Sequence, residues 1–162
     1  MAKNDRAADK TNVMRLLDQA GIAYLPRYYD EALTAGEDIA ALLGEAPECV
    51  FKTLVTEDNK GGHYVFVIPV NATLDLKKAA RAAGSKSIAM IRQKELLPLT
   101  GYVHGGCSPV GMKKPFPTFI DETALITDAF FCSAGRRGAQ IGVDPQALSA
   151  YVGAAFADLT ED

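Results

Sequence analysis

Two apolar runs joined by a short polar turn constrain the fold of this chain more than any other feature. Residues 50–56 (VFKTLVT) and 64–70 (YVFVIPV) are rich in β-branched and aromatic side chains. Residues 58–62 (DNKGG) lie between them and have the composition of a tight turn. The segment therefore predicts a β-hairpin.

Helix and strand signals alternate along the rest of the chain. The sequence predicts helices over residues 11–20, 37–43, 74–83 and 93–97, and from Pro145 onward with Leu148, Tyr151, Val152 and Ala155 buried. It predicts strands over residues 22–29, 87–91, 118–121, 129–133 and 140–143. We expect Pro26 to hold its strand at a sheet edge and Pro98 to end its helix. This interleaving predicts an α/β fold with a mixed sheet.

Length and composition indicate one globular domain. A chain of 162 residues with 48% hydrophobic residues can bury a core without a disulfide or metal, and no Cys-x-x-Cys pair occurs. The net charge of -3 argues against binding nucleic acid through overall charge. No apolar run is long enough for a bilayer, and residues 1–12 lack a signal-peptide core. We expect a single domain over residues 1–162, a flexible tail at 1–10, no membrane partner and a cytoplasmic location.

The segment 101–117 (GYVHGGCSPVGMKKPFP) is a glycine- and proline-rich loop of the kind that carries function on a rigid scaffold. Gly106 and Gly111 have the spacing of a phosphate-binding loop, but Met112 stands where that loop needs lysine. A nucleophile elbow also fails, because Val110 replaces its second glycine. Neither a nucleoside-triphosphatase nor a serine hydrolase is indicated.

His104 and Cys107 in this loop allow two chemical interpretations. They could be half of a metal site, but the sequence has no matching second pair of ligands. Cys107 could also be a nucleophile with His104 as its base, but no third member of a triad is evident. The residues favour a chance pairing over either site.

Lys52 and the pair Gly105-Gly106 each have a structural and a functional interpretation. Lys52 alternates with Val50 and Leu54 on its strand, so it is either an edge lysine lying along apolar surface or an amine directed into a pocket. The two glycines are either a simple turn or a pair of N–H groups that stabilise an oxyanion. Spacing alone favours the structural interpretation of both.

Basic residues form three clusters in an otherwise acidic chain. They are Lys77, Lys78 and Arg81, then Lys113 and Lys114, and finally Arg136 and Arg137 between two glycines. If folding brings them together, they form a positive rim for a phosphate-rich ligand. The alternative is ordinary solvated surface.

Four segments taken together resemble the YbaK family. They are FKTLV around Lys52, LDLKKAA at 74–80, TGYVHGGCSPVGMKK at 100–114 and SAGRRG at 133–138. Members of this family are free-standing relatives of the editing domain inserted in bacterial prolyl-tRNA synthetase. The resemblance runs in order from about residue 13 to residue 158, and it is strongest to the branch that deacylates cysteinyl-tRNA(Pro).

This resemblance implies a single α/β domain in which helices surround one mixed, strongly curved β-sheet with a small pocket. It implies an aminoacyl-tRNA deacylase that removes cysteine from tRNA(Pro) without metal or cofactor, through attack of the substrate thiol on its own ester to leave a thiolactone. Cys-tRNA(Cys) is an open second substrate. The implied partners are the acceptor end of aminoacylated tRNA, bound weakly and without sequence specificity, and prolyl-tRNA synthetase.

The resemblance also implies site residues. The expected catalytic residues are Lys52, Gly105 and Gly106, and the expected substrate-binding residues are Tyr29, Thr53, Ser108, Pro109 and Ser133. This chain departs from the family pattern at His104 and Cys107, which puts pocket size and polarity in question. Gln140 stands where some members carry aspartate, so it receives no catalytic role.

Three alternatives stay open. The chain could be a non-catalytic module that binds a synthetase or tRNA. It could be a thioester or ester hydrolase that uses Cys107 with His104. It could also be a deacylase whose amino-acid preference is shifted by those two residues.

Overall fold

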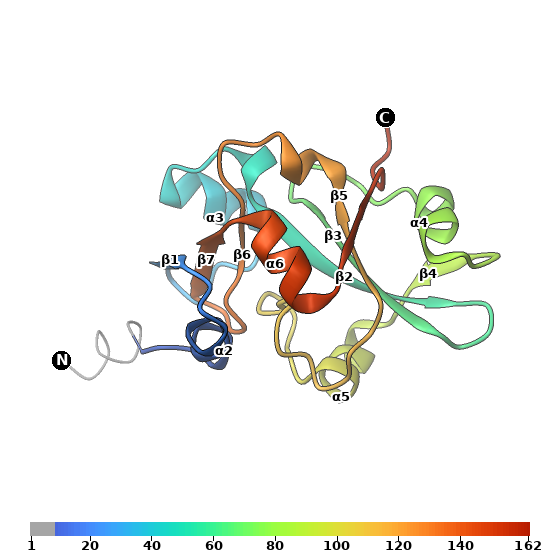
Figure 1. Ribbon diagram of the computed structural model, residues 1–162, viewed down its shortest axis with the longest axis horizontal. Coiled ribbons are helices and arrows are strands. Elements are labelled where there is room, and N and C mark those ends of the chain that lie inside the picture. The colour runs from blue at the N-terminus through green and yellow to red at the C-terminus, as the bar shows by residue number, and fades with distance from the viewer. Residues whose placement is uncertain (1–8) are drawn as a thin grey trace.

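A computed structural model describes residues 9–162, so residues 1–8 of the expected tail lie outside the described residues (Figure 1). The chain forms an α/β fold of two sheets and five α-helices within this range. The predicted α/β class is confirmed. Three 3₁₀ turns, η1 (Pro47–Cys49), η2 (Gln93–Glu95) and η3 (Glu122–Leu125), complete the described elements.

The larger sheet has five strands in the order β4-β2-β3-β5-β8. Its strands are β2 (Phe51–Asp58), β3 (His63–Pro69), β4 (Ile88–Met90), β5 (Thr118–Asp121) and β8 (Ala155–Ala157). The pairs β3–β5 and β5–β8 are parallel, whereas β2 pairs antiparallel with β3 and β4, so the predicted mixed sheet is confirmed. The predicted hairpin is β2–β3, and Asp58 Oδ1 closes its turn by accepting from the N–H groups of Lys60 (2.9 Å) and Gly62 (2.7 Å).

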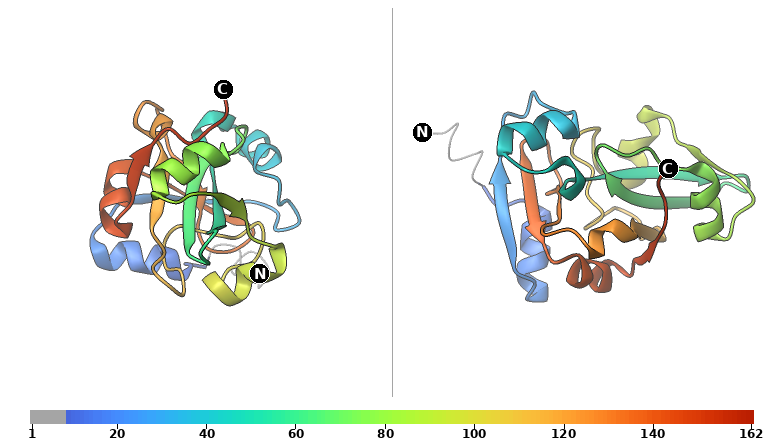
Figure 2. Two further views of the ribbon diagram at one scale, coloured as in Figure 1. Left: turned by 90° about the vertical axis from the view of Figure 1, so that its right-hand side faces the viewer. Right: turned by 90° about the horizontal axis from the view of Figure 1, so that it is seen from above.

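The smaller sheet has three antiparallel strands in the order β1-β7-β6. They are β1 (Tyr24–Tyr28), β6 (Phe131–Ser133) and β7 (Ala139–Val143), and β1 lies at an edge, as Pro26 predicts. Here the expectation of one strongly curved sheet is wrong. Among residues 9–162 the strands divide into two sheets, and an isolated bridge between Val50 and Phe131 links them next to the starts of β2 and β6 (Figure 2).

The five helices are α2 (Asn12–Ala20), α3 (Gly36–Leu43), α4 (Leu76–Ala83), α5 (Leu96–Thr100) and α6 (Pro145–Val152). The Thr11 side chain caps α2 by accepting from the Met14 N–H at 3.2 Å, and Gly21 ends the helix in a left-handed conformation. The helix α4 begins two residues later than predicted, because Asp75 serves as its N-cap. The longest of the described helices has nine residues, which is too short to cross a bilayer.

The C-terminal ends of two helices differ from the sequence predictions. Pro98 lies inside α5, which ends at Thr100 with Gly101 as its C-cap. The helix tolerates Pro98 because a proline in the first turn breaks no intrahelical hydrogen bond. The last helix ends at Gly153, and Ala155 belongs to strand β8 rather than to the buried helical face. Tyr151, also expected to be buried, is 41% exposed.

The main hydrophobic core connects both sheets with α2 and α6. Leu17, Val67, Ile141 and Leu148 come from these four places and are all fully buried. A second cluster, centred on Phe66, Ile68 and Leu159, fills the space between the larger sheet and α4. The core thus holds the start of β2 against the smaller sheet, where the cavity described below opens.

Candidate functional site

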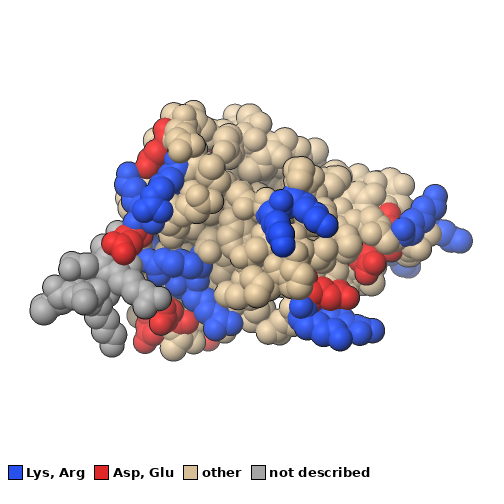
Figure 3. Space-filling model, turned by 90° about the horizontal axis from the view of Figure 1, so that it is seen from below, with Lys and Arg blue, Asp and Glu red and all other residues tan. Residues whose placement is uncertain are grey.

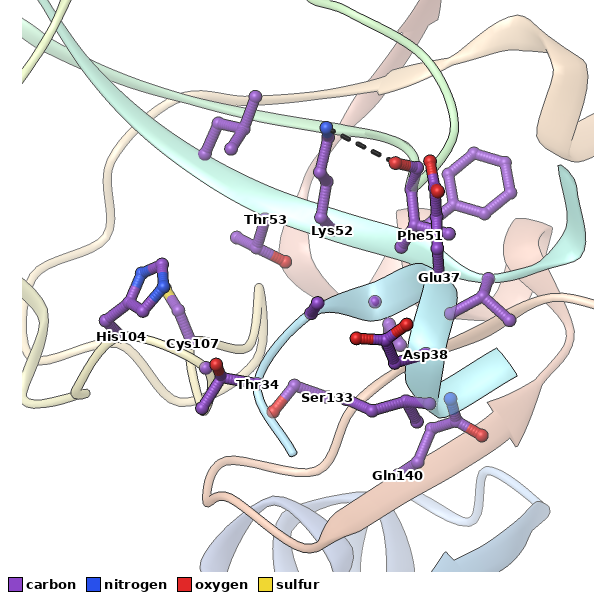
Figure 4. Close-up of a pocket in the computed structure, with 18 of the residues that line it drawn as sticks. Thr34, Glu37, Asp38, Phe51, Lys52, Thr53, His104, Cys107, Ser133 and Gln140 are labelled. Atoms are coloured by element: carbon purple, nitrogen blue, oxygen red, sulfur yellow. Dashed lines mark hydrogen bonds between the residues drawn. The ribbon is translucent and has the colours of Figure 1, made fainter. Parts of the chain in front are cut away.

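A cavity of about 660 Å³ lies where the two sheets meet (Figure 4). Its walls come from the start of β2, from β6 and β7, from the segment that leads into α3, and from the loop after α5. These parts of the chain contribute Tyr29, Thr34, Gly36, Glu37, Asp38, Lys52, Thr53, Leu96, His104, Gly105, Cys107, Ser133 and Gln140, among others. The cavity therefore draws together segments that are far apart in the sequence.

Lys52 enters this cavity from strand β2. Its Nζ lies 3.5 Å from the Val70 carbonyl oxygen, and its side chain is only partly exposed. Burial lowers the pKa of the Lys52 amine, while the nearby Glu37 carboxylate acts in the opposite direction. The structure therefore places Lys52 on the wall of the cavity, with its amine next to the Val70 carbonyl.

The two glycines, Gly105 and Gly106, occupy different environments. Gly105 lines the cavity with φ of 86°, and no described residue accepts a hydrogen bond from its N–H. Gly106 is buried away from the cavity wall, and its N–H donates to the Val103 carbonyl at 3.0 Å, which closes a tight turn. A side chain at Gly106 would meet the Arg136 backbone at 3.0 Å. Of the two predicted oxyanion donors, only the Gly105 N–H is free to act.

Ser108 and Pro109 are also buried outside the cavity wall. The Ser108 hydroxyl accepts from the Val110 N–H at 3.2 Å, and the Tyr102 hydroxyl donates to the Val110 carbonyl. These contacts give the loop its shape. The structure therefore does not bring these two predicted substrate-binding residues to the site.

The other three predicted substrate-binding residues, Tyr29, Thr53 and Ser133, do line the cavity. The Ser133 Oγ accepts from the Gly135 N–H at 3.1 Å. Burial raises the pKa of the Tyr29 phenol, which keeps it in its protonated, hydrogen-bond-donating form. The Thr53 Oγ1 is buried with no hydrogen-bond partner among the described residues, so it is available to a ligand.

Sequence reasoning missed three polar residues of the cavity wall, Thr34, Glu37 and Asp38, and gave no role to a fourth, Gln140. Gln140 is 3% exposed, and its Oε1 has no partner within residues 9–162. The two carboxylates lie in the first turn of α3, where acidic residues are common for reasons of helix stability alone. The one available signal was the polar side chain of Gln140 in an otherwise apolar strand.

The cysteines in and beside the cavity are poor nucleophiles. Burial raises the pKa of the Cys107 thiol to about 12, and the buried Cys132 thiol behaves in the same way. A thiol with such a pKa is protonated at neutral pH. In the described part of the chain, no three His, Cys, Asp or Glu side chains gather as metal ligands.

On the face that Figure 3 shows, lysine and arginine side chains lie in separate groups and form no continuous basic surface. In the first cluster, the Lys78 amine is paired with Asp158 and Asp162 at 3.1 and 3.3 Å. In the third, the Arg137 Nε donates to the His104 carbonyl at 2.7 Å. Lys78 therefore fixes the C-terminal segment, and Arg137 contacts the loop that lines the cavity.

Comparisons with known proteins point to one family. A protein from Enterococcus faecalis, whose name assigns it as a Cys-tRNA(Pro)/Cys-tRNA(Cys) deacylase, is 44% identical, covering 99% of this chain and 98% of its own. A crystal structure described as a trans-editing enzyme for prolyl tRNA synthetase superposes with a TM-score of 0.81 at 27% identity, covering 95% of this chain and 100% of its own. A crystal structure of a hypothetical protein gives a TM-score of 0.86 at 28% identity, with 93% and 100% covered.

Residues 30–151, which include every polar residue named on the cavity wall except Tyr29, match the aminoacyl-tRNA editing domain. With that match, and with a relative 44% identical along nearly its whole length, the resemblance found in the sequence is confirmed. This chain belongs to the aminoacyl-tRNA editing domain family.

Proposed function

We propose that this protein deacylates tRNA(Pro) that carries cysteine, with Cys-tRNA(Cys) as a second substrate to be tested. The observation that carries the proposal is that Lys52 and Gly105 line the same cavity, although they come from β2 and from the loop after α5. The name of the E. faecalis relative supports the choice of cysteine as the amino acid.

The chemistry we propose uses the substrate's own thiol. The sulfur, after giving up its proton, forms a bond to the ester carbonyl carbon, and the bond from that carbon to the ribose oxygen breaks. The ribose oxygen takes up a proton, so the products are a thiolactone and uncharged tRNA. Well-oriented intramolecular reactions reach effective molarities of about 10⁵ M or more, so the protein needs to supply little beyond orientation and charge stabilisation.

Each cavity residue then has a role that its position supports. The Gly105 N–H stabilises the negative charge that develops on the carbonyl oxygen. Lys52 holds the terminal adenosine through its ribose oxygens or phosphate, and Tyr29, Thr53 and Ser133 position the aminoacyl group. Gly106, Ser108 and Pro109 shape the loop from behind and do not touch the substrate.

Recognition of the tRNA body is assigned to prolyl-tRNA synthetase. The chain has a net charge of -3 and no tryptophan, which does not favour tight or base-specific RNA binding. We infer weak binding of the acceptor end alone, in the cytoplasm where tRNA is charged. Tight, sequence-specific tRNA binding by the isolated protein would contradict this part of the proposal.

The test is a parallel deacylation assay on tRNA(Pro) charged with cysteine, alanine and serine, together with Cys-tRNA(Cys). We expect the cysteinyl substrates to be cleaved, the others spared, and the Lys52→Ala variant to lose at least about 100-fold in rate. Lys86→Ala, which removes an exposed lysine distant in sequence from the site, is the matched control.

Each other outcome of this assay has a distinct meaning. Preferential cleavage of alanyl- or seryl-tRNA would show that His104 and Cys107 have shifted the amino-acid preference. No cleavage of any substrate, with prolyl-tRNA synthetase present, would favour a non-catalytic binding module. Full activity of Lys52→Ala would remove this lysine from the mechanism.

A further inference from the structure

The tight turn that presents Gly105 to the cavity is of a kind whose central peptide group can point in either of two directions. The turn spans Val103 to Gly106, with the Gly106 N–H donating to the Val103 carbonyl at 3.0 Å. The positive φ of 86° at Gly105 is the value that a type II turn requires at its third residue. In a type I turn the central peptide is rotated by about half a turn, so that its C=O and N–H exchange directions.

The central peptide group of this turn joins the His104 carbonyl to the Gly105 N–H. The chain has no cis peptide bond among the described residues, so these two groups point to opposite sides of one planar unit. Whatever holds the His104 carbonyl therefore also sets the direction of the Gly105 N–H.

Arg137, at the tip of the β6–β7 connection, holds that carbonyl. Its Nε donates to the His104 oxygen at 2.7 Å, a short hydrogen bond from a charged donor. The same Nε would lie 3.4 Å from a Cβ atom added at Gly105. The turn also packs against the β6–β7 connection. A Cβ atom added at Gly106 would lie 3.0 Å from backbone atoms of Arg136 and Arg137.

We propose that Arg137 is a positioning residue of the deacylation site, and that its hydrogen bond to the His104 carbonyl holds the Gly105 N–H in the orientation that serves the reaction. The cation also withdraws electron density from the amide and makes its N–H a stronger donor to an oxyanion. This inference rests on the proposed function for the role of Gly105 and adds a residue to it. The alternative role for an exposed arginine here is a direct contact to a tRNA phosphate.

The experiment compares Arg137→Met, Arg137→Lys and the charge-matched control Lys86→Met in single-turnover deacylation of Cys-tRNA(Pro). For Arg137→Met we expect the maximal rate to fall by about 10- to 100-fold while the half-saturating concentration stays within about two-fold of the wild type. Arg137→Lys keeps a cationic donor and should recover part of the rate.

A tRNA-phosphate contact would give a different pattern. If Arg137→Met raises only the half-saturating concentration, and binding depends less steeply on salt, that result would overturn the positioning role. An unchanged maximal rate in Arg137→Met would do so as well.

A second measurement separates this inference from the proposed function. The Gly105 amide resonance of ¹⁵N-labelled protein should shift in Arg137→Met, whereas the Gly62 amide resonance in the β2–β3 turn should not change. If the wild type proves inactive, the proposed function fails, yet this spectrum still tests the coupling. An unmoved Gly105 resonance would rule the coupling out.

Discussion

The surroundings of Lys52 change the pKa of its amine. Its amine is partly buried at the start of β2, with the Val70 carbonyl at 3.5 Å and the Glu37 carboxylate nearby. Burial disfavours the charged amine, and Glu37 partly restores it. The balance between these two effects leads to a prediction about pH.

We predict that the Lys52 amine titrates below its ordinary pKa of 10.5, and that Glu37→Gln lowers this pKa further. Between the lowered pKa and 10.5 the folded protein binds fewer protons at Lys52 than the unfolded chain, so this residue makes folding more favourable as pH rises through that window. Activity that needs the charged amine is lost over the same rise. An NMR titration of the Lys52 side chain checks both; Lys86 is the exposed reference, and equal midpoints for the two lysines would contradict the prediction.

Cys107 lines the same cavity, but its buried thiol has a pKa of about 12. We therefore predict that Cys107→Ala stays within about three-fold of wild-type activity, because a protonated thiol is a weak nucleophile. Deacylation and iodoacetamide labelling, with Cys49→Ala as control, provide the measurement. A folded but inactive Cys107→Ala protein would favour a nucleophile supplied by the protein.

At the scale of the element, the loop after α5 turns a glycine into part of the cavity wall. Gly105 adopts φ of 86°, and a side chain there would lie 3.0 Å from the Thr34 Cγ2. Both the conformation and the space therefore require glycine. Gly21, at the end of α2, shares the positive φ of 72° but has no atom within 4 Å of the added carbon, which makes it a natural control.

We predict that Gly105→Ala loses at least about 10-fold in deacylation rate, because strain and the Thr34 contact move the N–H. Gly21→Ala should lower the free energy of unfolding by about 1 kcal/mol through φ strain alone and leave the rate unchanged. Rates and urea melts of both variants check this. Equal rates for the two variants would show that the Gly105 N–H is not used.

For the whole molecule, Asp121 joins elements that are distant in the sequence. It is 1% exposed; its Oδ1 accepts from the Leu159 N–H at 2.9 Å, and its Oδ2 accepts from the Thr123 hydroxyl at 2.6 Å. One carboxylate thus ties β5 and η3 to the C-terminal segment. Leu159 belongs to the core cluster between α4 and the larger sheet. The hydrogen bond to Asp121 therefore also holds a residue of that cluster in place.

We predict that Asp121→Ala lowers the free energy of unfolding by about 2–4 kcal/mol, because it leaves the buried Leu159 N–H without an acceptor. The deacylation rate of the folded fraction should change little, since Asp121 does not line the cavity. Urea denaturation measures the loss, with the exposed Asp128→Ala as control. A loss no larger than that of the control would show that the carboxylate is dispensable.

What the sequence by itself determined about this protein is mainly local. Thr11 and Gly21 bound the first helix, Asp58 and the glycines after it close the hairpin, and Pro26 keeps β1 at an edge. Each of these depends on side chains and φ angles within a few residues. Five of the residues named from the family resemblance also line the cavity: Tyr29, Lys52, Thr53, Gly105 and Ser133.

Only the tertiary structure decided how these parts meet. The division of the strands into two sheets, the pairing of β8 with β5 and the position of Gln140 in the cavity depend on contacts between distant segments. The same is true of the glycine pair, in which packing against Arg136 and Arg137 removes Gly106 from the site and leaves Gly105 in it. Sequence patterns report local conformation and burial, whereas the direction of a single N–H depends on what long-range packing places beside it.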